Sequence, residues 1–225
     1  MKFYMLYYFC DNMKEFYNKY LNERIKLDNL ILIGITCLII VISGVFGFIY
    51  EFIFYYFNGG MKDFYYRGGN FLPWINIYAI GSILIVLLTF KDRLKPIKVF
   101  LKSTIICGIL EFISGYIIYN YFGHFRCWDY NREILNFGNI GGFICLRSVV
   151  FFGVSSLLLI YGIIPIVIYL SKRINKKLFI TISIALCTIF LLDEIYNLVI
   201  ARVINTPRAS DVYKEIGVKY VEFKE

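Results

Sequence analysis

The sequence predicts an all-α membrane protein, a bundle of about five spanning helices with an amphipathic helix at its N-terminus. First, 59% of the 225 residues are hydrophobic, and the mean hydropathy is +0.66, values typical of integral membrane proteins. Second, the apolar residues form blocks of about 20, the length that crosses the hydrocarbon core of a bilayer. Third, the net charge of +8 is concentrated between these blocks, which favours contact with lipid headgroups and not with nucleic acid.

The segment 1–28 precedes the first block and is amphipathic. Phe3, Leu6, Phe16 and Tyr20 belong to an apolar series at helical spacing, and polar residues fill the other face. Such a helix lies in the membrane interface. A helix packed on the protein's own loops fits the same pattern, and both interpretations stay open.

The spanning helices are expected in one transmembrane domain, residues 29–204, followed by a C-terminal tail over 205–225. The five apolar blocks are Leu30–Phe57, Phe71–Phe90, Val99–Phe122, Leu146–Leu170 and Leu178–Ile200.

Charges in the connections predict the orientation in the cell membrane. Lys and Arg gather before the first block and in the second and fourth connections, at 14–26, 91–98 and 172–177. Such an excess marks the cytoplasmic side. The N-terminus of this multi-pass protein is therefore predicted to be cytoplasmic, and the first and third connections face outward. With five spans the C-terminal tail is expected on the outer side, and its charges are mixed.

Cysteine and histidine are sparse and scattered. The chain has six cysteines and one histidine, His124, without a CxxC or a Cys/His metal spacing. No metal or cofactor is predicted. Cys127 and Cys145 both fall on the predicted outer side, where a disulfide between them is one interpretation.

Glu111 stands near the middle of the third block. An acidic residue at the centre of a membrane costs about 2.5–3.5 kcal/mol even on insertion scales. Small and polar residues share its helical face, including Gly108, Ser114 and Gly115, as in helix–helix interfaces within membranes. We therefore expect Glu111 to point into the bundle.

Three further carboxylates lie in the outer parts of other blocks: Glu51, Asp193 and Glu194. Together with Glu111 they predict a substrate or ion pathway that opens to the outside, because ionisable groups within membranes are usually functional. The alternative is a set of ion pairs that fixes helix register. Candidate cationic partners are Arg67, Arg126, Arg147 and Arg202.

The outer connections, "YYRGGNFLPWINIYAIG" and "FRCWDYNREILNFGNIGGFICLR", combine aromatic, basic and acidic residues. Trp and Tyr alone would fit an interfacial belt, but the charges beside them suggest a cap or a binding site. The predicted outer-loop binding residues are Arg67, Trp74, Arg126, Trp128, Asp129, Tyr130 and Arg147.

These motifs occur in the order found in a bacterial family. The chain resembles the CmpB-like membrane proteins, a family of putative ABC-transporter type IV permeases, from about Gly44 to Pro165. The matching residues are Glu51, Arg67-Gly68, Pro73-Trp74, Ile77-Tyr78, Gly81, Glu111-Phe112, Tyr116, Trp128-Asp129-Tyr130, Asn139-Ile140, Gly142 and Ile144-Cys145-Leu146. Asn76, Cys127 and Phe143 depart from the pattern, and Phe143 replaces an arginine.

The resemblance implies a transporter permease of unknown substrate. No G-x-x-x-x-G-K-[ST] motif occurs, so an ATPase would be a separate chain. One alternative is a membrane-embedded enzyme that acts on a lipid or cell-envelope precursor, with Glu111 or Asp129 as the base. Another is a non-catalytic structural or sensory protein. The sequence gives no oligomeric state.

Overall fold

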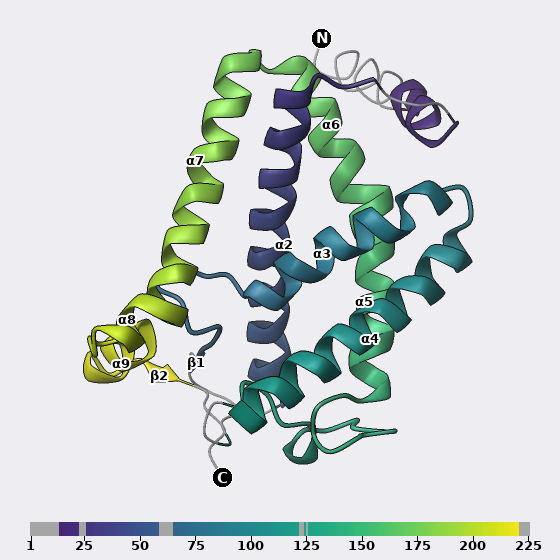
Figure 1. Cartoon of the computed structure of the whole chain (residues 1–225). Helices are drawn as coiled ribbons and strands as arrows, with labels where there is room; N and C mark the ends of the chain where they lie inside the picture. Colours follow the sequence, from purple (N-terminus) through teal and green to yellow (C-terminus); the bar gives the residue numbers. More distant parts are fainter. Residues whose placement is uncertain (1–13, 23–25, 59–64, 122–123, 125, 221–225) are drawn as a thin grey trace.

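The computed structural model describes residues 14–22, 26–58, 65–121, 124 and 126–220 (Figure 1), and helices dominate it. The all-helical prediction is confirmed at this level. The strands found in the described part are β1 (Tyr65–Tyr66) and β2 (Lys219–Tyr220), which pair in parallel.

Within the described residues, three helices are long and apolar enough to cross a membrane. The first is α2 (Asn29–Asn58). The second joins α5 (Leu146–Leu158), the π-helical turn η3 (Leu159–Ile163) and α6 (Ile164–Arg173). The third joins α7 (Lys176–Ile195), the π-helical turn η4 (Tyr196–Ile200) and α8 (Ala201–Val203). Each contains a span of at least 28 residues, or about 42 Å of helix, which exceeds the hydrocarbon thickness.

The predicted count of five spans is not confirmed. The second block, 71–90, contains only the 14 residues of α3 (Asn76–Thr89), about 21 Å of helix. The 3₁₀ turn η1 (Phe90–Asp92) leads to α4 (Pro96–Tyr121), which has 26 residues but also carries Lys98, Lys102 and Glu111. Neither α3 nor α4 is among the three candidate spans.

The start of α3 lies against the middle of α2, because the chain after β1 folds back along that helix (Figure 1). The backbone N–H of Ile75 donates to the carbonyl of Gly44, at 3.0 Å. A Cβ on Gly44 would lie 3.1 Å from the Cβ of Trp74 and 3.0 Å from the Phe190 ring, so this close approach favours glycine. Residues 67–75 are thus an irregular segment that packs on α2 and α7 with Asn70 and Trp74 buried and Phe71 and Leu72 exposed, and we call it the returning loop.

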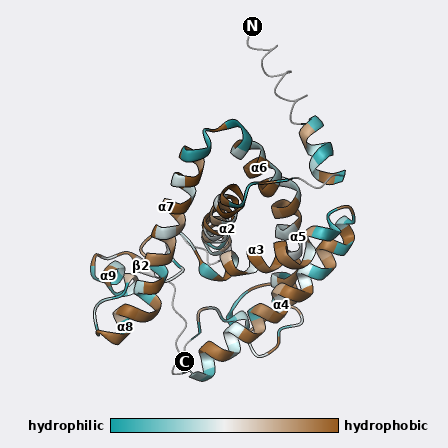
Figure 2. Cartoon of the chain, turned by 45° about the horizontal axis from the view of Figure 1, so that its top comes forward, coloured by the Kyte–Doolittle hydropathy of each residue, from teal (hydrophilic) through white to brown (hydrophobic). Residues whose placement is uncertain are grey.

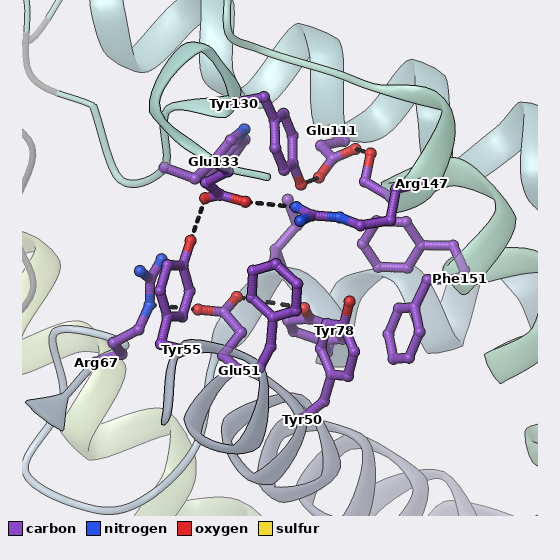
Figure 3. Close-up of a pocket in the computed structure, with 15 residues that line it drawn as sticks. Tyr50, Glu51, Tyr55, Arg67, Tyr78, Glu111, Tyr130, Glu133, Arg147 and Phe151 are labelled. Carbon is purple, nitrogen blue, oxygen red and sulfur yellow. Dashed lines mark hydrogen bonds and ion pairs between the residues drawn. The ribbon is translucent and has the colours of Figure 1, made fainter. Parts of the chain in front are cut away.

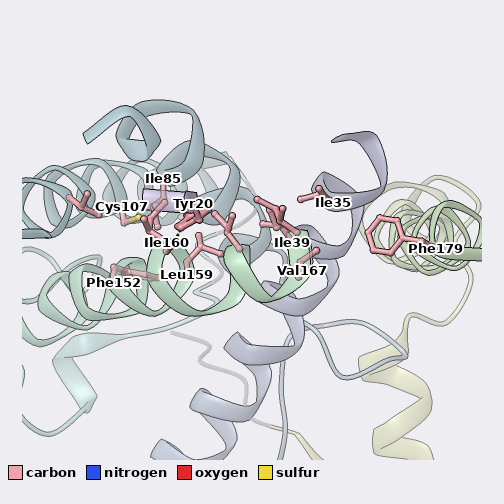
Figure 4. Close-up of a cluster of buried hydrophobic side chains, with 13 residues drawn as sticks. Tyr20, Ile35, Ile39, Ile85, Cys107, Phe152, Leu159, Ile160, Val167 and Phe179 are labelled. Atoms are coloured by element: carbon pink, nitrogen blue, oxygen red, sulfur yellow. Dashed lines mark hydrogen bonds between the residues drawn. The ribbon is translucent and has the colours of Figure 1, made fainter. Parts of the chain in front are cut away.

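The main apolar core joins α2, α3, α4, the α5–η3–α6 helix and the first turn of α7 (Figure 4). The helical residues 14–22 also contact it. Tyr20 is fully buried and its hydroxyl donates to the carbonyl of Ile160, at 2.6 Å. Arg93 donates from Nε to the carbonyl of Tyr20, at 3.0 Å. The described part of the N-terminal segment therefore packs on the protein, and residues 1–13 and 23–25 lie outside the described part.

Figure 2 shows apolar residues along the long helices and polar residues near their ends. The C-terminal residues form α9 (Ala209–Glu215) and β2 and pack against the returning loop. Tyr213 stacks on Tyr66 with ring centroids 4.2 Å apart, and its hydroxyl donates to the carbonyl of Phe71, at 2.7 Å. This packing brings α8 and α9 to the same end of the molecule as the connection between α4 and α5, which includes the 3₁₀ turn η2 (Tyr130–Arg132).

Candidate functional site

Asp193 and Glu194, on α7, hold the returning loop. Asp193 accepts hydrogen bonds from the backbone of Phe71 and Leu72, each at 2.9 Å, and from the Trp74 indole at 3.0 Å. Glu194 accepts from the amides of Asn70 and Asn76, at 2.7 and 3.1 Å. These carboxylates accept hydrogen bonds from backbone and side-chain donors of an irregular segment, which has no helical partners for its own N–H groups. We call this group the loop clamp.

A second group of polar residues surrounds a small cavity between α2, α3, α4 and α5 (Figure 3). On its α2 side, Glu51 forms an ion pair with Arg67 of the returning loop, with Oε2 2.5 Å from Nε. The Tyr78 hydroxyl donates to the other oxygen of Glu51, at 3.3 Å. The guanidinium of Arg67 also stacks on the Tyr55 ring, 3.9 Å from its centroid. Burial lowers the pKa of Arg67, but Glu51, Tyr55, Glu133 and Tyr78 together raise it by more, so the net pKa is above its ordinary value.

Glu133, from the connection between α4 and α5, joins two of these elements. It accepts a hydrogen bond from the Tyr55 hydroxyl and forms an ion pair with Arg147, at the start of α5. Arg147 stacks on Phe54 of α2, 4.1 Å from the ring centroid, and donates from Nη1 to the carbonyl of Ile134, at 2.8 Å. These contacts link the connection between α4 and α5 to the C-terminal part of α2.

Glu111 is 4% exposed, and its hydrogen-bond donors are hydroxyl groups. Tyr130 donates to Oε1, and Ser148 donates to Oε2 at 2.7 Å. Burial, and then the charge of Glu111, raise the pKa of the Tyr130 phenol well above its ordinary value. The phenol is therefore protonated at neutral pH and acts as a donor to Glu111.

We call the charged residues around this cavity the carboxylate network; they are Glu51, Glu111, Glu133, Arg67 and Arg147. Three carboxylates thus face two guanidiniums, and Glu51 and Glu133 each have one of the two as an ion-pair partner. The cavity between them measures about 30 Å³, enough for one or two water molecules.

A larger cavity of about 250 Å³, which we call the chamber, lies beside this network. Its walls come from the returning loop, α3, α4 and the C-terminal residues 197–210. Four charged residues line it: Glu51, Arg67, Arg202 and Arg208. Glu51, Arg67, Ile77 and Trp128 line both cavities, so the Glu51–Arg67 pair stands in the wall between them.

The structure separates the predicted pathway residues into two places. Glu51 and Glu111 both line the small cavity. Asp193 and Glu194 lie in the loop clamp and are absent from the linings of the small cavity and the chamber. Their predicted role in a pathway stays a prediction.

The predicted outer-loop residues divide in the same way. Arg67, Trp128, Tyr130 and Arg147 line the small cavity, whereas Trp74 belongs to the loop clamp.

Arg126 and Asp129 instead order the outer connection itself. The Arg126 guanidinium stacks on the rings of Tyr119 and Phe143 and donates to the carbonyl of Gly141, at 2.9 Å. Asp129 accepts from the backbone of Asn131, at 3.1 Å. Cys127 and Cys145 are both free cysteines, so of the two interpretations of this pair the structure favours the one without a disulfide.

Several residues that line the two cavities were not predicted as site residues from the sequence. Glu133, Tyr78 and Ser148 line the small cavity, and Arg208 lines the chamber. Tyr78 lies 27 positions after its hydrogen-bond partner Glu51, and Glu133 lies 78 positions after its partner Tyr55. No local spacing in the sequence therefore links either pair. The one available signal was the clustering of Tyr and Arg near the predicted outer boundary. Among the described residues, no group of three or more His, Cys, Asp and Glu side chains could hold a metal ion.

The comparisons with known proteins add one finding. The model of the family described as "Putative ABC-transporter type IV" matches residues 38–198. This range contains the whole carboxylate network and the loop clamp. No curated protein matches the chain, and no solved structure does.

Proposed function

Since the chain belongs to the family described as "Putative ABC-transporter type IV", we propose that it is the multi-pass permease component of a transporter, with its substrate or ion pathway along the chamber and the carboxylate network. The family and the three long apolar helices identify a transport-related membrane protein. The pathway, its residues and its partners are the proposed part.

The charge balance of the carboxylate network carries the proposal. Three carboxylates share a small cavity with two guanidiniums. An uncompensated charge in such a place is expensive, and a group that can take up a proton avoids the cost. Glu111 is the carboxylate whose described partners are hydroxyl groups. We infer that Glu111 holds an exchangeable proton in the resting protein.

The Glu51–Arg67 pair supplies a connection between the chamber and this proton. Arg67 contacts Glu51 at 2.5 Å, and both residues line both cavities. An anionic group in the chamber would compete with Glu51 for Arg67. Release of Glu51 would increase the negative charge facing Glu111 and favour its protonated form. Occupancy of the chamber and protonation of the network are therefore coupled in the proposed mechanism.

The proposed orientation places the chamber on the outer side of the cell membrane and the N-terminus in the cytoplasm. The described helix 14–22 and the C-terminal helix α9 lie at opposite ends of the molecule in Figure 1, which supports the two ends being on opposite sides. Cys127 is exposed and provides a test. An impermeant thiol reagent should label it in intact cells, in a variant without the other cysteines, and protection there with labelling in inverted vesicles would reverse the orientation.

A separate ATPase chain is the proposed energy source, as the family description implies. The connection around η1, residues 91–98, is the proposed contact, since it lies at the cytoplasmic end in this orientation. Co-purification of a chain that hydrolyses ATP supports this step. Retention of that chain after Lys91 and Lys95 are replaced by Glu would argue against this contact.

The function is tested without knowledge of the substrate. Cells that lack the protein are complemented with wild type, Glu111→Gln or Glu215→Gln at matched expression, and the solutes of cells and medium are compared. Glu215 is exposed on α9 and serves as the matched control. Glu111→Gln should reproduce the deletion, and Glu215→Gln the wild type. A Glu111→Gln protein that restores the wild-type distribution of solutes contradicts the proposal. If that variant is also less stable than wild type, the result supports the alternative that Glu111 only fixes the packing of the helices.

A further inference from the structure

We propose that the chamber binds an anionic amphiphile, with a phosphate or carboxylate headgroup between Arg202 and Arg208 and an apolar chain along α3, α4 and the α7–α8 helix. This inference deepens the proposed function, on which it rests for the chamber's role in transport. It names the chemical class of the substrate.

The charges that line the chamber favour an anion. Among the described residues that line the chamber, the charged side chains are the guanidiniums of Arg67, Arg202 and Arg208 and the carboxylate of Glu51. Arg67 and Glu51 form their own ion pair. Arg202 and Arg208 are the described cations of this lining that lie outside that pair.

Arg208 keeps donors for a ligand. Its Nε lies 3.4 Å from Oδ2 of Asp211, and its side chain is 33% exposed. A guanidinium has five N–H groups in a planar fork, so one contact through Nε does not use its hydrogen-bonding capacity. Two such forks in one cavity suit a headgroup with several acceptor oxygens.

The polar wall beside these arginines is fixed by contacts within the protein. Asn197 lies in the π-helical turn η4, and such turns occur frequently at functional sites. Its side chain donates to Asp193 at 2.8 Å and accepts from the backbone of Ala209 at 2.7 Å. The second bond sets the start of α9, directly after Arg208. The wall is preorganised, which lowers the ordering cost of binding.

The other wall is apolar and continues to the outside of the molecule. Ile77, Ile80, Ile118 and Leu198 line the chamber. Ile80 is 53% exposed and Leu198 is 50% exposed, and both belong to apolar helices. An acyl or prenyl chain attached to the headgroup could leave the chamber along this surface and remain in contact with hydrocarbon.

The size of the chamber supports this division of the ligand. Its volume of about 250 Å³ is below the 300–1,000 Å³ typical of pockets that enclose a whole drug-sized ligand. A headgroup fits inside, and the chain of an amphiphile must lie outside. A small free anion would use the arginines but not the apolar wall.

The test is direct binding to the full, delipidated chain in a neutral detergent, measured by native mass spectrometry. The probes are dioleoyl phosphatidylglycerol, dioleoyl phosphatidylcholine and glycerol phosphate, which separate headgroup charge from the apolar chain. We expect one phosphatidylglycerol per chain at concentrations where the other two do not bind. Equal binding of the two lipids would overturn the anion assignment. Glycerol phosphate that binds as tightly as phosphatidylglycerol would overturn the amphiphile assignment.

Variants locate the site. Arg202→Gln with Arg208→Gln should lower the affinity for phosphatidylglycerol by about tenfold or more, because charge-assisted hydrogen bonds are lost. The control, Arg132→Gln with Lys214→Gln, removes two charges from residues that do not line the chamber and should bind like wild type. Equal loss in both double variants would refute the assignment.

A second kind of variant tests the location even if the double arginine variant misfolds. Ser114 lines the chamber from α4, and Ser114→Trp fills it without changing a charge. This variant should also lose phosphatidylglycerol binding, and normal binding would contradict the location. Lipid binding is measured independently of transport. If phosphatidylglycerol binds as expected but Glu111→Gln complements the deletion like wild type, the proposed function is refuted and the lipid site is not.

Discussion

Replacement of Asp193 by Asn should destabilise the returning loop strongly. Each carboxylate oxygen accepts two hydrogen bonds at 2.8–3.0 Å, from the backbone of Phe71 and Leu72 and the side chains of Trp74 and Asn197. Asn keeps one oxygen, so two bonds are lost and an amide group faces two donors. Hydrogen bonds to charged groups contribute about 1.5–3 kcal/mol each. The expected loss is therefore about 3 to 6 kcal/mol, a large share of a typical free energy of unfolding.

Thermal unfolding of the purified protein and hydrogen exchange of the peptide 67–76 measure this effect. Asp28→Asn is the matched control, because Asp28 pairs with Lys176 at the surface and caps Leu30, a role that Asn fills equally well. Asp193→Asn should lower the unfolding temperature and speed exchange of the loop amides, whereas Asp28→Asn should do neither. Equal behaviour of the two variants would refute the loop clamp.

Three further perturbations probe other parts of the structure. Gly47→Ala should cost about 1–3 kcal/mol in chemical unfolding, because a Cβ there would lie 2.2 Å from the Tyr78 ring; an unchanged midpoint would contradict this contact. Glu133→Gln should cost about 3 kcal/mol, because it leaves the guanidinium of Arg147 without its buried carboxylate, and Glu215→Gln is its control. Asp92 forms ion pairs with two lysines, and these lower its pKa to about 2. Ionised Asp92 stabilises the folded protein at pH values above the ordinary pKa of an aspartate, and this stabilisation is lost as the pH falls. The difference in unfolding temperature between wild type and Asp92→Asn should therefore shrink from about pH 5 to about pH 2. A constant difference would refute the assignment.

The sequence predicted the helical class and the three long apolar helices, because an apolar block of about 20 residues most simply forms a helix that crosses a membrane. It placed residues 71–75 of the returning loop in the second spanning block, because hydropathy counts apolar residues without regard to conformation. Phe71, Leu72 and Trp74 are apolar, yet their backbone is irregular and bonds to α7. Pro73, which cannot donate a backbone hydrogen bond, was the local sign that the helix begins later.

The candidate site was predictable where it follows helical spacing. The face of α4 that holds Glu111 with Gly108 and Gly115 is buried as expected. The partners of that face come from distant connections. Tyr130 and Ser148 reach Glu111 from 19 and 37 positions away, so these hydroxyl partners could be identified only in three dimensions.

The proposed pathway depends on an exchangeable proton held by Glu111 in the carboxylate network. Infrared difference spectroscopy of wild type against Glu111→Gln, at neutral pH, tests it most directly. We predict a carboxylic-acid carbonyl band in the wild type that shifts in heavy water and is absent from Glu111→Gln, while Glu215→Gln keeps it. Wild-type and Glu111→Gln spectra with the same acid band would show that the proton is elsewhere and contradict the proposed role of Glu111.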